Sequence, residues 1–167
     1  MLVAGKRYTL NNPKPATFPL ECTGLFLFGH HNTNLDMKNV LLVDDDKIFN
    51  FINTQMLKQT GMAREIHTAL NGKQAIDYLN ESYRETSSVP DVILLDLNMP
   101  IMNGFDFLEA FKIMGLPDKE KEHVNIIVVT SSDNQQDIDK ARDMGANHYL
   151  TKPLSAESLK HALEYSE

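Results

Sequence analysis

The sequence is poor in cysteine, in basic residues and in long apolar runs. Its single cysteine, Cys22, excludes an internal disulfide framework and a cysteine-rich zinc site. No stretch approaches the roughly 18 consecutive apolar residues of a transmembrane helix. Lysine and arginine number 16 against 23 aspartates and glutamates, a net charge of −7 that disfavours nucleic acid or an anionic membrane as main partner. With 42% hydrophobic residues, we expect one soluble domain. We also expect it to lie in the cytoplasm.

Residues 1–36 show no sustained hydrophobic period. Three prolines and the Asn11–Asn12 pair are turn signals, and the one dense apolar run, Leu25–Phe28, is too short and too late for a signal peptide. An ordered pattern begins at Met37. We therefore interpret residues 1–36 as a flexible or non-native N-terminal extension and residues 37–167 as the folded domain.

From Val40 onward, short apolar runs alternate with segments of helical period. The predicted strands are Val40–Val43, Glu65–Ala69, Val92–Leu95, Ile126–Val129 and Asn147–Thr151. The uniformly apolar runs, such as Val40–Val43 and Val92–Leu95, are typical of strands buried on both faces, and Glu65–Ala69 is a weaker strand. Residues 81–90 and 115–125 are polar and are expected to be connectors. The alternation predicts an α/β fold, with a five-stranded parallel sheet and helices on both faces.

Two of the predicted helices have a clear apolar face. In residues 47–59, the side chains that fall on one face are Ile48, Phe51, Ile52 and Met56. In residues 105–114, the corresponding side chains are Phe107, Leu108 and Phe111. Because an amphipathic helix buries its apolar stripe, both faces are expected to pack against the sheet.

Polar residues stand directly after four of the five predicted strands. They are Asp44, Asp45 and Asp46 after the first strand, Asp96 after the third, Thr130 and Ser131 after the fourth, and Lys152 after the fifth. In an open α/β sheet, ligands bind beyond the carboxyl ends of the strands. These side chains are therefore expected to meet at one edge of the sheet.

The chemistry of this group favours a metal ion and a phosphoryl group. Asp44, Asp45 and Asp96 would repel one another unless a cation lay among them, and oxygen ligands without histidine or cysteine favour Mg²⁺. Lys152 and Thr130 suit phosphoryl oxygens, and an aspartate beside them is a competent phosphoryl acceptor. Each residue alone also has an ordinary explanation as a helix cap or loop residue. It is their convergence that favours a site.

Four segments resemble the receiver domain of two-component response regulators, the CheY-like family. They are VLLVDDD (40–46), VILLDLNMPIMNGFDFL (92–108), IIVVTSS (126–132) and YLTKPL (149–154), in the family's order. The resemblance spans Lys38 to about Leu163. It implies a flavodoxin-like sheet with strand order 2-1-3-4-5. Because the chain ends at Glu167, just past the last predicted helix, we expect a stand-alone receiver.

The resemblance also implies a magnesium site and a phosphoacceptor. Asp96 would accept a phosphoryl group from a sensor histidine kinase or a histidine phosphotransfer protein. Asp44, Asp45, Asp96 and the backbone carbonyl of Asn98 would hold Mg²⁺. The domain would catalyse only its own phosphorylation and dephosphorylation, and so would not be an enzyme in the ordinary sense.

The resemblance also implies a change of conformation on phosphorylation. Thr130 and Lys152 would hold the phosphoryl group. Tyr149 would turn inward when Thr130 moves towards the phosphoryl group. The Lys152–Pro153 bond would be cis. The altered face would then bind a downstream protein, whose identity the sequence leaves open, as it leaves open whether the domain forms a homodimer.

Two other classes of protein share parts of this pattern. A haloacid-dehalogenase-type phosphatase also combines a strand-end aspartate, a hydroxyl, a lysine and Mg²⁺, but its D-x-D-x-T/V motif meets Ile48 in the last place, and no acidic pair follows Lys152. A receiver-like binding module that has lost phosphorylation would lack Asp96, Thr130 or Lys152, and all three are present. The receiver interpretation accounts for the order of the motifs.

Overall fold

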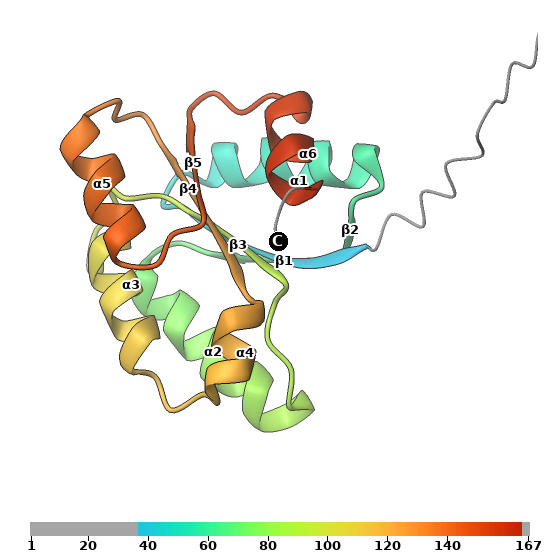
Figure 1. Cartoon of the computed structure of the whole chain (residues 1–167). Coiled ribbons are helices and arrows are strands. Elements are labelled where there is room, and N and C mark those ends of the chain that lie inside the picture. Colours follow the sequence, from blue (N-terminus) through green and yellow to red (C-terminus); the bar gives the residue numbers. More distant parts are fainter. Residues whose placement is uncertain (1–36, 165–167) are drawn as a thin grey trace, which may run out of the picture. The chain divides into compact units, whose positions relative to one another are not determined.

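A parallel sheet forms the centre of the folded domain. In the computed structural model, which describes residues 37–164, five parallel strands form one sheet in the order β2-β1-β3-β4-β5 (Figure 1). The strands are β1 Lys38–Val43, β2 Ala63–Ala69, β3 Val92–Leu95, β4 Asn125–Thr130 and β5 His148–Thr151. This confirms the predicted α/β class and strand order. The extension predicted at residues 1–36 lies outside the described residues.

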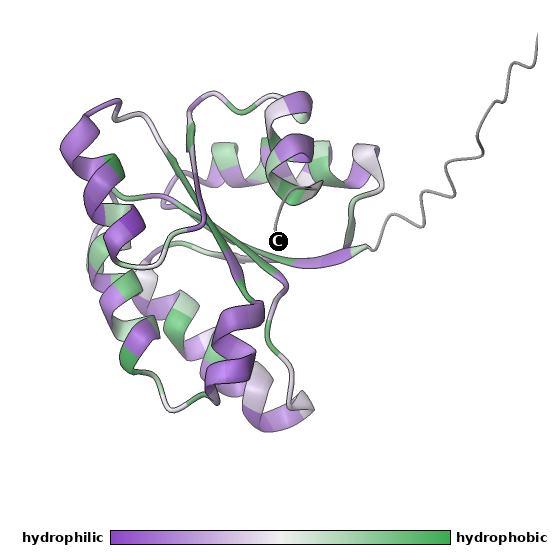
Figure 2. Ribbon diagram, viewed as in Figure 1, coloured by the Kyte–Doolittle hydropathy of each residue, from purple (hydrophilic) through white to green (hydrophobic). Residues whose placement is uncertain are grey.

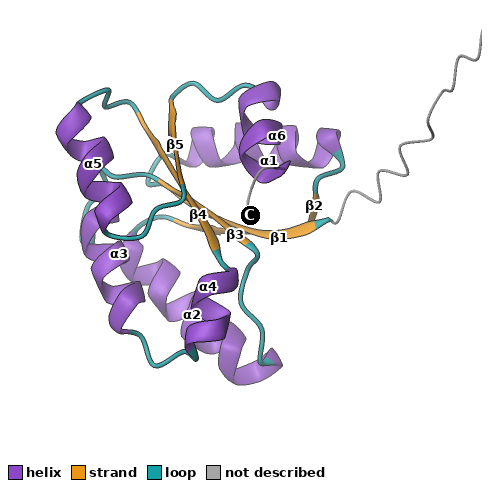
Figure 3. Ribbon diagram, in the orientation of Figure 1, coloured by secondary structure: helices purple, strands orange, loops and turns teal. Residues whose placement is uncertain are grey.

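Helices cover both faces of the sheet. They are α1 Lys47–Thr60, α2 Gly72–Thr86, α3 Gly104–Ile113, α4 Asp118–His123, α5 Gln135–Asp143 and α6 Ala156–Glu164. Figure 3 shows α1 and α6 together on one face and the other helices on the opposite face. Within the described residues, none of the helices has the length and apolar character needed to cross a bilayer.

The three central strands, β1, β3 and β4, are held by burial on both faces. Along β1, Leu41 and Val43 join the apolar cluster beneath α2, α3 and α5, while Val40 and Leu42 join the cluster beneath α1 and α6. All residues of β3 and β4 are buried. Figure 2 shows the resulting band of hydrophobic residues through the sheet. This two-sided burial explains why the central strands contain uniform apolar runs, whereas the edge strands β2 and β5 are more polar and more exposed.

The two predicted connectors proved partly helical, so that part of the prediction was wrong. Helix α2 continues to Thr86, and residues 118–123 form the extra helix α4. Helix α4 has no buried residue and therefore offers no apolar period to detect. Acidic residues in its first turn and basic residues in its last turn complement the helix dipole. Buried Leu116 and Val124 anchor its two ends.

The predicted inward face of α1 was also wrong. Ile48, Phe51 and Ile52 are 71%, 64% and 55% exposed, and only Met56 packs partly against the core. The buried residues of α1 are instead Asn50, Asn53 and Leu57. The helix is rotated so that its inward side meets the loop after β1. On α3, by contrast, Phe107, Leu108 and Phe111 are buried as predicted.

A glycine closes the loop between β3 and α3. A Cβ atom on Gly104 would clash with the carbonyl oxygen of Asp96 and lie 2.8 Å from the Cα of Leu97. The Gly104 amide donates a hydrogen bond to the Leu97 carbonyl at 3.0 Å. The start of α3 thus packs directly against the backbone of Asp96, and only glycine leaves room for this approach.

We expect Gly104→Ala to destabilise the domain by about 1–3 kcal/mol, because the added methyl group must displace backbone atoms. The measurement is the free energy of unfolding in urea. Gly115→Ala is the matched control, since a Cβ there meets nothing within 4 Å. Equal losses in the two variants would contradict the steric explanation.

Candidate functional site

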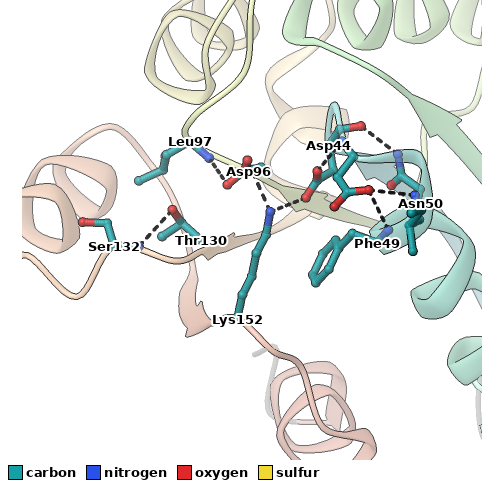
Figure 4. Close-up of polar contacts among 10 residues, drawn as sticks. Asp44, Phe49, Asn50, Asp96, Leu97, Thr130, Ser132 and Lys152 are labelled. Carbon is teal, nitrogen blue, oxygen red and sulfur yellow. Dashed lines mark hydrogen bonds and ion pairs between the residues drawn. The ribbon is translucent and has the colours of Figure 1, made fainter.

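The carboxyl ends of four strands bring the predicted site residues to one edge of the sheet. Asp44 follows β1 and Asp96 follows β3, which is paired with β1. Thr130 is the last residue of β4, and Lys152 directly follows β5. Figure 4 shows Asp44, Asp96 and Thr130 around the end of the Lys152 side chain.

Three carboxylates form the acidic part of this site. One oxygen each of Asp44, Asp45 and Asp96 lies within 4.8 Å of the others. Asp44 and Asp96 are buried, whereas Asp45 is exposed. A set of carboxylate oxygens without nitrogen or sulfur ligands fits a hard divalent cation such as Mg²⁺.

The loop after β1 is held by the start of α1. Asp46 caps the helix by accepting hydrogen bonds from the amides of Ile48 and Phe49, at 2.8 and 3.2 Å. The carboxylate of Asp44 accepts from the Asp46 amide at 2.9 Å. The carbonyl of Asp44 accepts from the Asn50 side-chain amide at 2.7 Å. These bonds fix the loop that carries the first two carboxylates.

Lys152 supplies the positive charge. Its Nζ lies 2.5 Å from Asp44 Oδ2, 3.3 Å from Asp96 Oδ2 and 4.3 Å above the centre of the Phe49 ring. Its backbone amide donates to the Thr130 carbonyl at 2.9 Å, and the Lys152–Pro153 bond is cis. One ammonium group thus serves two buried carboxylates.

The environment of Asp96 disfavours its charge. Burial raises the pKa of this carboxyl above its ordinary value. The Lys152 ammonium lowers the pKa, Asp44 raises it, and the backbone amide of Asn98 lowers it. The Leu97 amide also donates to Asp96 Oδ1 at 2.9 Å. The pKa is raised on balance because the effect of burial exceeds the lowering by Lys152 and the backbone amide.

A chain of hydrogen bonds leads away from Thr130. The Thr130 side chain is fully buried, and its Oγ1 accepts from the Ser132 amide at 3.3 Å. The Tyr149 hydroxyl donates to the Ser132 carbonyl at 2.9 Å, and the Ser132 hydroxyl donates to Asp137 at 2.8 Å. Burial raises the pKa of the Tyr149 hydroxyl above its ordinary value. Ser132 therefore links the site to β5 and α5.

Sequence reasoning anticipated most of these residues but missed Asn50. The apolar stripe on the opposite side of α1 predicted that side, and not the side of Asn50, to face inward. A usable signal was present, because Asn50, Asn53 and Leu57 also share one side of the helix. Asn98 is exposed and contributes a backbone amide to Asp96. Its predicted role as a metal ligand through the carbonyl stays a prediction.

The chain is similar to known proteins along nearly all of the described residues. The sequence pattern of the family described as "Response regulator receiver domain" matches residues 40–164. The probable methanogenesis regulatory protein FilR2 of Methanothrix harundinacea is 30% identical over 125 residues, which are 75% of this chain and 78% of that protein. A crystal structure of a two-component response regulator from Cytophaga hutchinsonii superposes with a TM-score of 0.69 at 35% identity, covering 77% of this chain and 95% of that one.

The same domain also occurs inside much longer proteins. Hybrid signal transduction histidine kinase G of Dictyostelium discoideum is 30% identical over 132 residues, which are 78% of this chain but 4% of that protein. These matches give no support to the phosphatase alternative, and they agree with the strand order, the acidic cluster and the strand-end lysine. The chain belongs to the response regulator receiver domain family of two-component phosphorelay systems.

Proposed function

We propose that Asp96 is the phosphoacceptor of this receiver and that Asp44, Asp45, Asp96 and the Asn98 carbonyl hold Mg²⁺. The observation that carries the proposal is the cluster of three carboxylates beside one lysine. Burying a carboxylate without a compensating positive charge is strongly destabilising, and here two of the three acids are buried beside a single cation. A divalent cation would supply the missing charge.

The proposed reaction is a transfer between two proteins. The phosphorus–nitrogen bond of a phosphohistidine breaks as an oxygen of Asp96 bonds to phosphorus, and the imidazole leaves with the electron pair and takes up a proton. Bound Mg²⁺ would neutralise charge on the phosphoryl oxygens. Lys152 offers a second positive charge. The hydroxyl of Thr130 accepts from Ser132 but keeps its own hydrogen to donate to a phosphoryl oxygen.

The proposed signal leaves the site through Ser132. Phosphorylation would draw Thr130 and Lys152 towards the new dianion. Ser132 would follow, since its amide donates a hydrogen bond to the Thr130 hydroxyl and its carbonyl accepts one from the Tyr149 hydroxyl. The equilibrium between inactive and active conformations would shift towards an arrangement of α5, β5 and α6 that binds the downstream protein. Hydrolysis of the acyl phosphate in the same site would end the signal.

The exposed apolar side chains of α1 suit the phosphodonor protein. Ile48, Phe51 and Ile52 are each more than half exposed on a helix that begins at the site. Asp96 is only 5% exposed, so a phosphohistidine must approach over the rim formed by the surrounding loops and helix starts. Exposed apolar groups beside such a rim are typical of protein interfaces. We propose that the histidine kinase or phosphotransfer protein docks on these three residues, the α1 patch.

Incubation with Mg²⁺ and acetyl phosphate should add one phosphoryl group, measured by mass spectrometry of the intact protein. Asp96→Asn should abolish the gain, because the amide oxygen is a poor nucleophile. Asp106→Asn, a change at an exposed aspartate in the first turn of α3, should leave it intact. An unchanged gain in Asp96→Asn would refute the assignment of the phosphoacceptor.

The raised pKa of Asp96 predicts a cost in stability. The folded state holds the proton more tightly than the unfolded state, so ionisation of Asp96 lowers the free energy of unfolding at neutral pH. Asp96→Asn should therefore raise the melting temperature at pH 7 in the presence of a chelator. The gain should shrink as the pH falls through the raised pKa, where the wild-type carboxyl becomes neutral. A lower melting temperature for Asp96→Asn at pH 7 would contradict this balance of charges.

The α1 patch can be tested by comparing two phosphodonors. Phe51→Ala should slow phosphotransfer from the phosphorylated partner protein about tenfold or more, the effect of losing an aromatic interface anchor. Its rate with acetyl phosphate should not change, because the small donor needs no docking surface. Ile113→Ala is the matched control, since Ile113 is 80% exposed at the far end of α3. Equal slowing with both donors would argue against docking.

A further inference from the structure

Asn50 has a buried side-chain amide, and its two polar atoms differ in their hydrogen bonding. The side chain lies on the inward side of α1, and the residue is 5% exposed. Its Nδ2 donates to the carbonyl of Asp44 at 2.7 Å (Figure 4). Its Oδ1 is buried and has no hydrogen-bond partner. An unpaired buried carbonyl destabilises the folded state, so a leucine of similar volume would suit packing better.

The bond from Asn50 controls the peptide between the first two acids of the site. The peptide group is planar, so holding the Asp44 carbonyl also fixes the direction in which the chain leaves towards Asp45. The side chain of Asp45 is exposed, and among residues 37–164 no hydrogen bond or ion pair holds its carboxylate. Its place beside Asp44 and Asp96 therefore depends on the backbone.

We propose that Asn50 is a positioning residue for the metal site. Its amide holds the Asp44–Asp45 peptide so that the Asp45 carboxylate is presented to the cation together with Asp44 and Asp96. The unpaired Oδ1 is the cost of keeping this donor in an apolar layer. The inference rests on the proposed Mg²⁺ site and adds a residue that does not touch the ion.

The test is calorimetric titration of the full chain with Mg²⁺, without any phosphodonor. Asn50→Leu should weaken Mg²⁺ binding about tenfold or more, as is usual when a residue that orients metal ligands is lost. Its melting temperature without Mg²⁺ should be equal to that of the wild type or higher. Should Asn50→Leu fold poorly, Asn50→Ala removes the same donor and should give the same loss of affinity.

Asn53→Leu is the matched control. Asn53 is 2% exposed, three residues further along the same helix, and makes no bond to Asp44. Its replacement should leave Mg²⁺ affinity within about twofold of the wild type, well inside the tenfold effect expected at Asn50. Unchanged affinity in both Asn50 variants, or equal weakening in Asn53→Leu, would overturn the positioning role. Failure of the wild type to bind Mg²⁺ would instead overturn the metal site itself.

Discussion

Repulsion among buried carboxylates is the constraint around which this domain is arranged. Asp44 and Asp96 lie side by side because β1 and β3 are neighbours in the sheet, and Lys152 reaches both from the end of β5. One ammonium faces three acids, and burial raises the pKa of Asp96 even though Lys152 lowers it. The apolar layers on both sides of the sheet must therefore supply the stability that the site withholds, as functional sites commonly require.

The two sides of the site are built differently, and the difference suits a switch. On the β1 and β3 side, backbone contacts leave little freedom: Gly104 packs on the Asp96 carbonyl, and Asp46 ties its loop to α1. On the β4 side, the side chains of Thr130 and Tyr149 are linked through hydrogen bonds to Ser132. Side-chain hydrogen bonds can exchange partners more readily than tightly packed backbone segments can be displaced. Phosphorylation of Asp96 would therefore change the structure mainly at β5 and α5.

The fold and the site differed in how far the sequence revealed them. Strands such as Val92–Leu95 were identified because burial on both faces leaves an uninterrupted apolar run. The site residues were identified because they stand at strand ends, where topology forces them together. Helix α4 was missed because nothing in it is buried. The orientation of α1 was mistaken because periodicity reports that an apolar face exists but not what covers it.

Helix α1 shows why that last distinction matters. A helix that served only the core would turn Ile48, Phe51 and Ile52 inward, and its residue pattern would permit this. Instead it presents Asn50 to the loop that carries the acids and leaves the apolar residues in solvent. Leu57 alone, in its last turns, is a fully buried apolar anchor. The helix thus gives up packing energy on both sides, inward to order the acidic loop and outward to keep an apolar surface exposed. A conflict between local pattern and packing is expected where function, rather than stability, decides the orientation.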